Sequence, residues 1–361
     1  MMYTSPLHDA HTAAHAHLRL FRKFSIPFYH ESVLKEYMHV QQRVGLTDVC
    51  YLSRVLIEGS DAEQYLNMLS TQDEATLSQE MYHRSLLCNP GGGIVGDCIV
   101  TRDEERFLLI VDSYDRETVL HWLTENKKHY KVTITDKTDS LAHVLIDGSD
   151  AEKALSLTLE LDGDSIASSH YCRKSMFGVP VIIIGSTRTG EKGYELLMHK
   201  DIALQVWKKF LQDAERTGIA PIGSCAREIL RIERGLPTFG NEIDETTLPF
   251  DVNLSEYVYL RKRKFIGKDA LMLHTESEIS KRLVCFTMND RIIPRKGSEI
   301  IRDDMPVGKV TSGGFSPTSQ KAIGMGFVDQ IESKPGNELF IRIHGKTHSA
   351  IIIKDLFKQN D

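Results

Sequence analysis

The sequence predicts an α+β protein in which two related α/β subdomains are followed by a C-terminal β-barrel. Two observations carry this prediction. Residues 57–66 (IEGSDAEQYL) and residues 146–155 (IDGSDAEKAL) are identical at seven of ten positions, 89 residues apart. From Lys281 onward, short strand-like runs alternate with turn residues at regular spacing. That second pattern is typical of a small all-β barrel.

The two similar segments each follow a strand-like run and precede a helical pattern, so each predicts a strand–turn–helix unit. Each also contains Ser-x-x-Glu: Ser60 with Glu63, and Ser149 with Glu152. This spacing is typical of a capping box, in which each side chain satisfies an unpaired amide at the helix start. Convergence on a good helix start would explain the cap alone. Because the identity extends beyond it, we interpret the segments as two copies of one unit.

The composition is that of a globular protein with two or three domains. The chain has 361 residues, of which 41% are hydrophobic and 26% charged. The net charge of −6 argues against a general nucleic-acid or anionic-membrane surface. No run approaches the roughly 18 apolar residues of a membrane span. The N-terminal segment lacks the basic start and apolar stretch of a secretory signal and is poor in Arg, so we expect a cytoplasmic protein.

The cysteines and the N-terminal histidines are candidates for disulfide bonding or metal binding. The six cysteines are scattered without a CxxC pair, which predicts reduced thiols. A helix is predicted to carry four histidines near the N-terminus: His8, His11, His15 and His17. His11 and His15 have the i, i+4 spacing of some zinc ligands, but no third ligand is evident nearby. We therefore expect a solvated or partly packed helix and no metal.

The rest of the sequence predicts a hairpin, a linker and further helices and strands. A turn at Gly91–Gly93 predicts a β-hairpin over residues 85–102, and the polar segment Glu276–Ser280 predicts a linker. Further helices are predicted at residues 31–44 (ended by Gly45), 117–126 and 201–215, and further strands at 107–112 and 179–185.

Three charged residues are candidates for function. Asp97 lies in the strand-like run IVGDCIV, where it is either an outward-facing edge charge or a carboxylate held in a pocket. The residues alone favour the edge charge. Glu195 is predicted in a strand after a turn bracketed by glycines, and Arg227 lies near a predicted helix start. They are candidates for a polar pair in a ligand pocket, although the residues alone favour a structural ion pair.

Several long blocks resemble one known family. "TGEKGYEL", "AREILRIERGLPTFGNEIDETTLP", "FIGKDAL" and "GKVTSGGFSPTSQKAIGMGFV" are similar, in this order, to signature blocks of the glycine cleavage system T-protein family. These proteins are tetrahydrofolate-dependent aminomethyltransferases. The resemblance runs from Ser5 to Phe357 and implies three domains around a central folate channel. The implied domains are a folate-binding domain (1–50 plus 141–275), a second subdomain (51–140) and the C-terminal barrel (281–361).

The resemblance also implies site residues. Asp97 matches the family's essential aspartate, although the preceding Asp of the family is Gly96 here. This match favours the pocket carboxylate over the edge charge. Glu195 and Arg227 match the residues that contact folate. The implied cosubstrate is tetrahydrofolate, and the implied partner is a lipoyl carrier protein of the H-protein type. No nucleic-acid or membrane partner is implied.

Four segments depart from the family pattern. They are Phe21–Phe24, Cys50–Leu52, Arg188 and Val111–Asp115, all of which the resemblance places along the channel. The residues that match the folate contacts are kept, whereas the channel-lining segments differ. This combination suggests that the protein binds the same folate, and it leaves the identity of the one-carbon donor open. The leading hypothesis is an aminomethyltransferase. The alternatives are a tetrahydrofolate-dependent demethylase of a small N-, O- or S-methyl donor, and a non-catalytic folate-binding protein.

Overall fold

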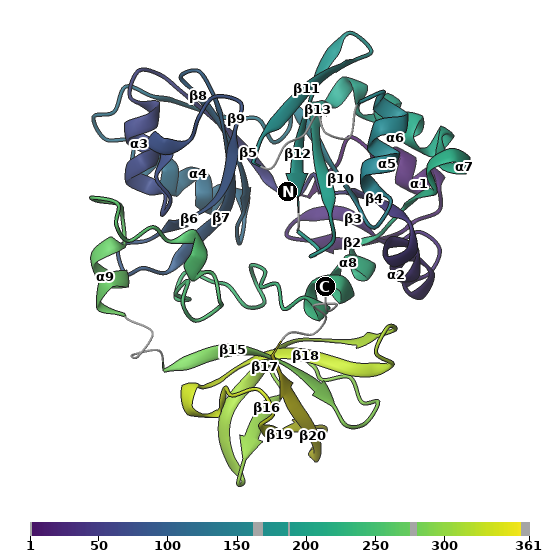
Figure 1. Ribbon diagram of the computed structural model, residues 1–361, viewed down its shortest axis with the longest axis vertical. Coiled ribbons are helices and arrows are strands. Elements are labelled where there is room, and N and C mark those ends of the chain that lie inside the picture. Colours follow the sequence, from purple (N-terminus) through teal and green to yellow (C-terminus); the bar gives the residue numbers. More distant parts are fainter. Residues whose placement is uncertain (1, 162–168, 187, 275–279, 355–361) are drawn as a thin grey trace. The chain divides into compact units, whose positions relative to one another are not determined.

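The protein folds into two compact units. The computed structural model describes residues 2–161, 169–186, 188–274 and 280–354. Unit 1 comprises Met1–Ser85 and Gly96–Arg227, and unit 2 comprises Leu86–Val95 and Glu228–Asp361 (Figure 1). The predicted α+β class is confirmed, because helices and several sheets share the chain. Residues 228–275 group with the barrel, so these units and the three predicted domains divide the chain differently.

One of the sheets of unit 1 has six strands, in the order β11-β12-β13-β10-β4-β14. Helices α5 and α6 pack against this sheet (Figure 1). Apolar side chains from the sheet and from these helices form one buried core. The strands are β4 (Val44–Asp48), β10 (Leu141–Asp147), β11 (Tyr171–Met176), β12 (Val179–Ser186), β13 (Gly193–His199) and β14 (Ile219–Pro221). The helices are α2 (Val33–Gln42), α5 (Ala151–Leu159), α6 (Lys200–Gln212) and α7 (Ala214–Thr217).

A five-stranded sheet follows the order β6-β7-β8-β5-β9. Its strands are β5 (Ser53–Glu58), β6 (Tyr82–Cys88), β7 (Ile94–Asp103), β8 (Arg106–Asp112) and β9 (Thr133–Asp136). The helical segments are α3 (Ala62–Leu69), the 3₁₀ turn η1 (Glu74–Thr76) and α4 (Arg116–Glu125). The predicted hairpin is confirmed as β6 and β7, whose tip, Leu86–Val95, belongs to unit 2.

The duplicated segments do form matching units. In each, a strand ends at a glycine with positive φ and a helix follows: β5–Gly59–α3 and β10–Gly148–α5. A Cβ on Gly59 would lie 2.3 Å from a backbone oxygen, and one on Gly148 would lie 2.5 Å from another. Glycine is therefore required at both positions, because any side chain would be strained at the positive φ and would also collide with the neighbouring backbone.

The predicted capping boxes are wrong. The helices begin at Ala62 and Ala151, one residue later than that motif requires, and neither N-cap residue makes a side-chain cap. The hydroxyl of Ser149 instead donates to the backbone oxygen of Arg43 (3.2 Å). The two glutamates form ion pairs elsewhere: Glu63 with Arg102, and Glu152 with Lys192. Tertiary partners compete here with the local motif.

The N-terminal segment is mostly strand. A three-stranded sheet of order β1-β3-β2 is formed by β1 (Tyr3–Thr4), β2 (His17–Phe21) and β3 (Phe24–Tyr29), with α1 (His8–Ala13) between β1 and β2. The prediction of one helix with four histidines is wrong, because His15 has a φ of +55° and His17 lies in β2. His11 is buried and contacts Asp48 (3.0 Å). Within the described ranges, no group of three or more His, Cys, Asp or Glu is arranged to hold a metal.

Two predicted helix boundaries are wrong. The helix expected at residues 31–44 is α2, capped by Ser32, and Gly45 lies in β4 instead of ending a helix. The helix expected at residues 201–215 is divided into α6 and α7 at Asp213. The helix expected at 117–126 is α4, which begins at Arg116.

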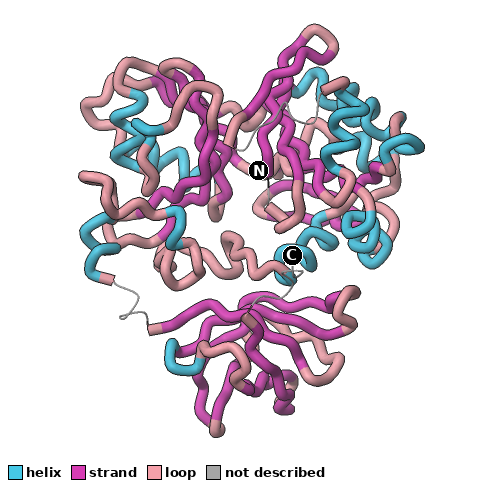
Figure 2. Tube along the Cα trace, viewed as in Figure 1, coloured by secondary structure: helices cyan, strands magenta, loops and turns pink. Residues whose placement is uncertain are grey.

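Unit 2 contains the predicted barrel, which is confirmed. Six strands close into a barrel in the order β15-β18-β17-β16-β19-β20, and Figure 2 shows these strands in magenta. Their inward-facing apolar side chains form a buried core. They are β15 (Lys281–Met288), β16 (Glu299–Arg302), β17 (Met305–Ser316), β18 (Lys321–Asp329), β19 (Glu338–Ile343) and β20 (Lys346–Ile353). Unit 2 also contains α9 (Lys268–Leu273) and the 3₁₀ turns η3 (Ser255–Tyr257) and η5 (Gln330–Glu332), and α8 (Ser224–Glu233) crosses the boundary between the units. Of the predicted linker, only Ser280 lies within the described residues.

Two chemical expectations can be compared with the fold. All six cysteines lie among the described residues and none of them forms a disulfide, in accord with the prediction of reduced thiols. Among the residues that the structure describes, no helix is long and apolar enough to cross a membrane.

Candidate functional site

Asp97 lies on β7 and is held by Arg84 of β6. Nε of Arg84 donates to Oδ1 of Asp97 (2.8 Å), and Nη2 donates to Oδ2 (2.5 Å). The carboxylate is only 7% exposed, and β7 lies between β6 and β8. The edge-charge interpretation of Asp97 is therefore wrong, since β7 is an interior strand. The geometry is the bidentate pairing that orients a carboxylate most firmly.

Cys98, the next residue, faces away from this pair. Its Sγ donates to the backbone oxygen of Ser85 (3.3 Å), and its side chain is fully buried. Burial raises the pKa of the Cys98 thiol well above its ordinary value. A protonated thiol is a poor nucleophile, in accord with the expectation that Asp97 alone of these neighbours faces the site.

Glu195 lies on β13 and has no exposed surface. Its Oε1 accepts hydrogen bonds from the hydroxyl of Ser186 (2.8 Å) and from Nε of Arg188 (2.6 Å). Its Oε2 lies 2.9 Å from Nε2 of His143, although the two atoms are not aligned for a hydrogen bond. Burial alone would raise the pKa of Glu195, but Arg188 and His143 hold it well below its ordinary value. Glu195 is therefore a buried anion.

Arg188 connects the candidate residues. Burial alone would lower its pKa, but Glu195, Asp97 and Asp112 together raise it. Arg188 therefore lies within electrostatic reach of carboxylates on β7, β8 and β13. The polar pair suggested between Glu195 and Arg227 is wrong in its partner, because Glu195 pairs with Arg188.

Arg227 lies near the start of α8, as expected. Its Nη1 contacts the hydroxyl of Tyr51 at 3.4 Å. Burial would lower the pKa of Arg227, but Tyr51 and Asp147 raise it, and Arg188 opposes them. Arg227 therefore shares an electrostatic neighbourhood with Arg188. The tertiary fold brings Asp97, Glu195 and Arg227 around one cation.

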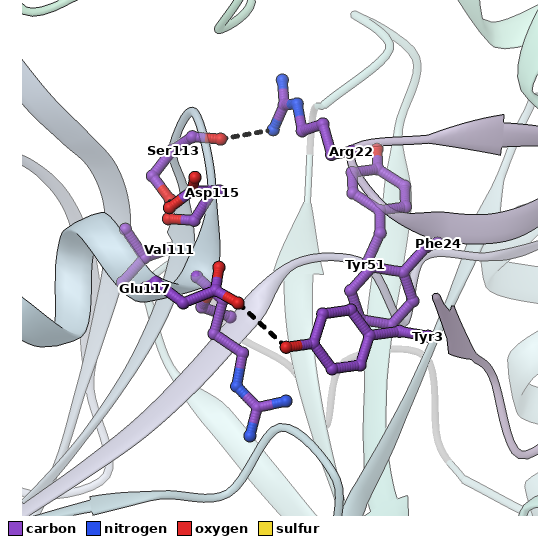
Figure 3. Close-up of a pocket in the computed structure, with 10 residues that line it drawn as sticks. Tyr3, Arg22, Phe24, Tyr51, Val111, Ser113, Asp115 and Glu117 are labelled. Atoms are coloured by element: carbon purple, nitrogen blue, oxygen red, sulfur yellow. Dashed lines mark hydrogen bonds between the residues drawn. The ribbon is translucent and has the colours of Figure 1, made fainter. Parts of the chain in front are cut away.

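The segments that depart from the family pattern meet beside this cluster. Arg22, at the tip of the β2–β3 hairpin, forms an ion pair with Asp112 and donates to the backbone oxygen of Ser113 (2.7 Å) (Figure 3). The ring of Tyr51 packs edge-on against Phe21, with 5.0 Å between centroids. Tyr51, Arg22 and Ser113 line a cavity of about 10 Å³ (Figure 3). This volume is about that of a single water site, so the altered side chains fill the space between them.

Several buried polar atoms of the cluster have unused hydrogen-bonding capacity. Within the described part of the chain, no hydrogen-bond partner is found for Nη2 of Arg188 or Nε of Arg227, and Oε2 of Glu195 has only the misaligned contact with His143. Buried polar groups are nearly always satisfied, so such groups indicate a place for a polar ligand. An acceptor beside two guanidinium donors matches the mixed donors and acceptors of an amino-pyrimidine edge.

Fold and site together define a class: an α+β protein with a closed barrel and a buried carboxylate–guanidinium cluster suited to a polar heterocycle. Comparison with known proteins then identifies the family. Residues 7–262 match the GCVT N-terminal domain, and residues 281–358 match the glycine cleavage T-protein C-terminal barrel domain. The chain therefore belongs to the glycine cleavage T-protein family, and the predicted resemblance is confirmed.

Individual relatives agree with this assignment. The chain is 32% identical to an aminomethyltransferase of Thermoanaerobacter pseudethanolicus, covering 99% of this chain and 98% of that protein. It is 33% identical to an aminomethyltransferase of Caldanaerobacter subterraneus, covering 99% and 96%. The crystal structure of glycine cleavage system aminomethyltransferase T from Bartonella henselae superposes with a TM-score of 0.92 at 26% identity, covering 99% of both chains.

The sequence missed three members of the cluster. No motif in the sequence marks Arg84 or His143, and Arg188 differs from the family pattern without a predicted partner. Arg84 and His143 are polar residues within strand-like runs, which is the signal that could have identified them. Their partners lie on other strands, so only pairing between strands reveals the contacts.

Proposed function

We propose that this protein is a tetrahydrofolate-dependent aminomethyltransferase in which Asp97 is catalytic and Glu195 and Arg227 bind the folate. Membership of the T-protein family makes it a one-carbon transferase. The observation that carries the residue assignment is the cluster around Arg188. Glu195 accepts a hydrogen bond from Arg188 (2.6 Å), Asp97 raises the pKa of Arg188, and Arg188 in turn opposes the raised pKa of Arg227. Curated relatives at 32–33% identity are named aminomethyltransferases, which supports the activity.

The pterin end of the folate is assigned to Glu195 and Arg227. A carboxylate that stays ionised accepts hydrogen bonds from an amino-pyrimidine edge, and buried pairing of this kind discriminates strongly against other ligands. Arg188 keeps Glu195 ionised by lowering its pKa. Arg188 is thus a positioning residue for the binding carboxylate.

Asp97 is assigned to the reacting edge of the folate. In the proposed reaction, a folate nitrogen attacks an aminomethyl carbon carried on the lipoyl sulfur of an H-protein-like partner. Ammonia leaves, the carbon–sulfur bond breaks to release the carrier's lipoyl thiol, the two folate N–H protons go to these leaving groups, and 5,10-methylenetetrahydrofolate forms. Asp97 orients the attacking nitrogen and stabilises the positive charge that develops during transfer. Arg84 fixes the direction of the Asp97 carboxylate through two hydrogen bonds.

The test is analysis of the folate product. Purified protein is incubated with tetrahydrofolate and a lipoyl carrier protein charged with an aminomethyl group, and the folates are identified by mass spectrometry. Methylenetetrahydrofolate that forms only with the charged carrier supports the proposal. No product with the charged carrier, but 5-methyltetrahydrofolate with a small methyl donor, would instead establish the demethylase.

Binding is tested separately by calorimetry with tetrahydrofolate. Glu195→Gln is preferred to Glu195→Ala because it keeps the volume of a fully buried side chain. We expect tight binding to the native protein and at least tenfold weaker binding to the variant. Binding without turnover of any donor would favour the non-catalytic folate-binding protein.

A further inference from the structure

A second cavity in unit 1 lies apart from the Arg188 cluster. It has a volume of about 310 Å³ and lies between the five-stranded and six-stranded sheets. Ligand pockets for small molecules begin at about 300 Å³, so this cavity has room for a compact ligand. None of Asp97, Glu195, Arg188 or Arg227 lines it.

The inner wall of this cavity is apolar. Leu108 and Tyr171 are buried at 8% and 5% exposure and belong to the core shared by the two sheets. Leu141 and Ile182 pack against that core and also face the cavity, as does Leu56 of β5. Five large side chains therefore present an apolar surface that no other described residue fills.

The edge of the cavity is positively charged. Arg106 and Arg173 both contact Oδ2 of Asp103, at 3.0 Å and 2.8 Å. These contacts use Nη2 of each guanidinium, and Arg173 also donates from Nη2 to the hydroxyl of Tyr171. Among the described residues, Nε and Nη1 of both arginines have no partner. One carboxylate thus holds two guanidinium groups in place and leaves donors on each.

Lys137 adds a third cation to the same edge. It follows β9 and lines the cavity, and in the described ranges its ammonium group forms no ion pair. With Arg106, Arg173 and Asp103, the lining carries three positive charges and one negative charge, on a chain whose net charge is −6. Such a local excess of cations over an apolar wall attracts an anion that carries an apolar body.

We propose that this cavity is a binding site for a small amphipathic anion, with its apolar body against Leu108 and Tyr171 and its anionic head at Arg106, Arg173 and Lys137. None of the residues of the Arg188 cluster lines this cavity, so the cavity is a separate site. This proposal does not depend on the proposed function.

The test compares four probes by calorimetry on the full chain. Octanoate supplies both parts of the ligand, 1-octanol supplies only the body, octylamine reverses the charge and acetate supplies only the head. We expect octanoate to bind at least tenfold more tightly than any of the others, and its affinity to fall as salt is added. Equal affinities for octanoate and octanol would overturn the proposal.

Two variants locate the probe. Leu56→Trp fills the cavity and is expected to abolish octanoate binding, whereas Leu20→Trp, at an exposed position of β2, is the control. Lys137→Gln is expected to weaken binding roughly two- to fivefold. Lys346→Gln removes the same charge from an exposed position in unit 2 and should have no effect.

Circular dichroism establishes that each variant is folded. Unchanged octanoate binding by folded Leu56→Trp would place the probe elsewhere and refute the site. Displacement of octanoate by tetrahydrofolate would likewise refute it, because the two ligands would then share one site.

Discussion

Asp97 and Asp112 are directly paired across the neighbouring strands β7 and β8, so two carboxylates lie side by side on one sheet. Like charges directly opposite in a sheet are destabilising. Each has its own arginine: Arg84 binds Asp97, and Arg22 binds Asp112. Arg188 is within electrostatic reach of both. The site is therefore a balanced charge network, and single substitutions have predictable effects.

Replacing Asp97 by Asn should separate binding from chemistry. The amide keeps the shape of the side chain but loses the negative charge to which we assign the stabilisation of the transfer step. We expect kcat to fall at least about 100-fold, while the Kd for tetrahydrofolate stays within about threefold. Steady-state kinetics and calorimetry measure the two quantities. Asp303→Asn, in the turn between β16 and β17, is the control, and full activity in Asp97→Asn would remove Asp97 from the mechanism.

Arg84 is expected to act through Asp97 without touching the folate. Arg84→Met leaves the carboxylate without its two hydrogen bonds, so kcat should fall about 10- to 100-fold with little change in the Kd for tetrahydrofolate. Arg84→Lys restores the charge without the bidentate geometry and should recover part of the activity. A parallel loss of folate binding would show a direct contact instead. Arg216→Met, at an exposed ion pair, is the control.

Replacing Arg188 by Met should reverse the pH dependence that Glu195 gives to stability. In the native protein the pKa of Glu195 lies below its ordinary value of 4.5, so its contribution is present above about pH 4.5 and lost as the pH falls further. Without Arg188, only His143 is left to lower that pKa, and burial, which is the largest single influence, raises it above 4.5.

The variant should therefore be destabilised by about 3–5 kcal/mol near neutral pH, because a buried carboxylate loses its partner. Its stability should rise as the pH falls from 8 to 5, whereas Glu195 contributes no such slope in the native protein. Urea denaturation at several pH values measures both effects, with Arg216→Met as the control. The same pH slope in native protein and variant would contradict the assignment.

The interaction between Arg22 and Asp112 should give a measurable coupling free energy. Both side chains are largely buried, at 13% and 16% exposure, so water screens them little. We expect a double-mutant cycle with Arg22→Ala and Asp112→Ala to give a coupling free energy of about 1–2 kcal/mol. The Arg342–Glu299 pair on the barrel, with both side chains 42% exposed, should give at most about 0.5 kcal/mol. Equal couplings would mean that burial adds nothing to the first pair.

The sequence by itself determined the fold class, the duplicated strand–turn–helix units and the barrel. These features depend on local periodicity, on turn glycines such as Gly59 and Gly148, and on apolar runs, all of which can be read along the chain. The family assignment was equally accessible, because its blocks are contiguous. Local patterns failed where tertiary partners compete with them, as at Ser149, whose hydroxyl binds Arg43 instead of capping α5.

Only the tertiary structure decided which charges meet. Arg84 lies 13 residues from Asp97 across the predicted hairpin, but the hairpin pattern does not say which side chains meet. His143 lies 52 residues from Glu195, on a strand that no local pattern pairs with β13. Whether Asp97 is an edge charge or a buried anion depends on which strands flank β7. The energy of a buried charge depends on everything that surrounds it in space, so it is fixed only when the sheets have assembled.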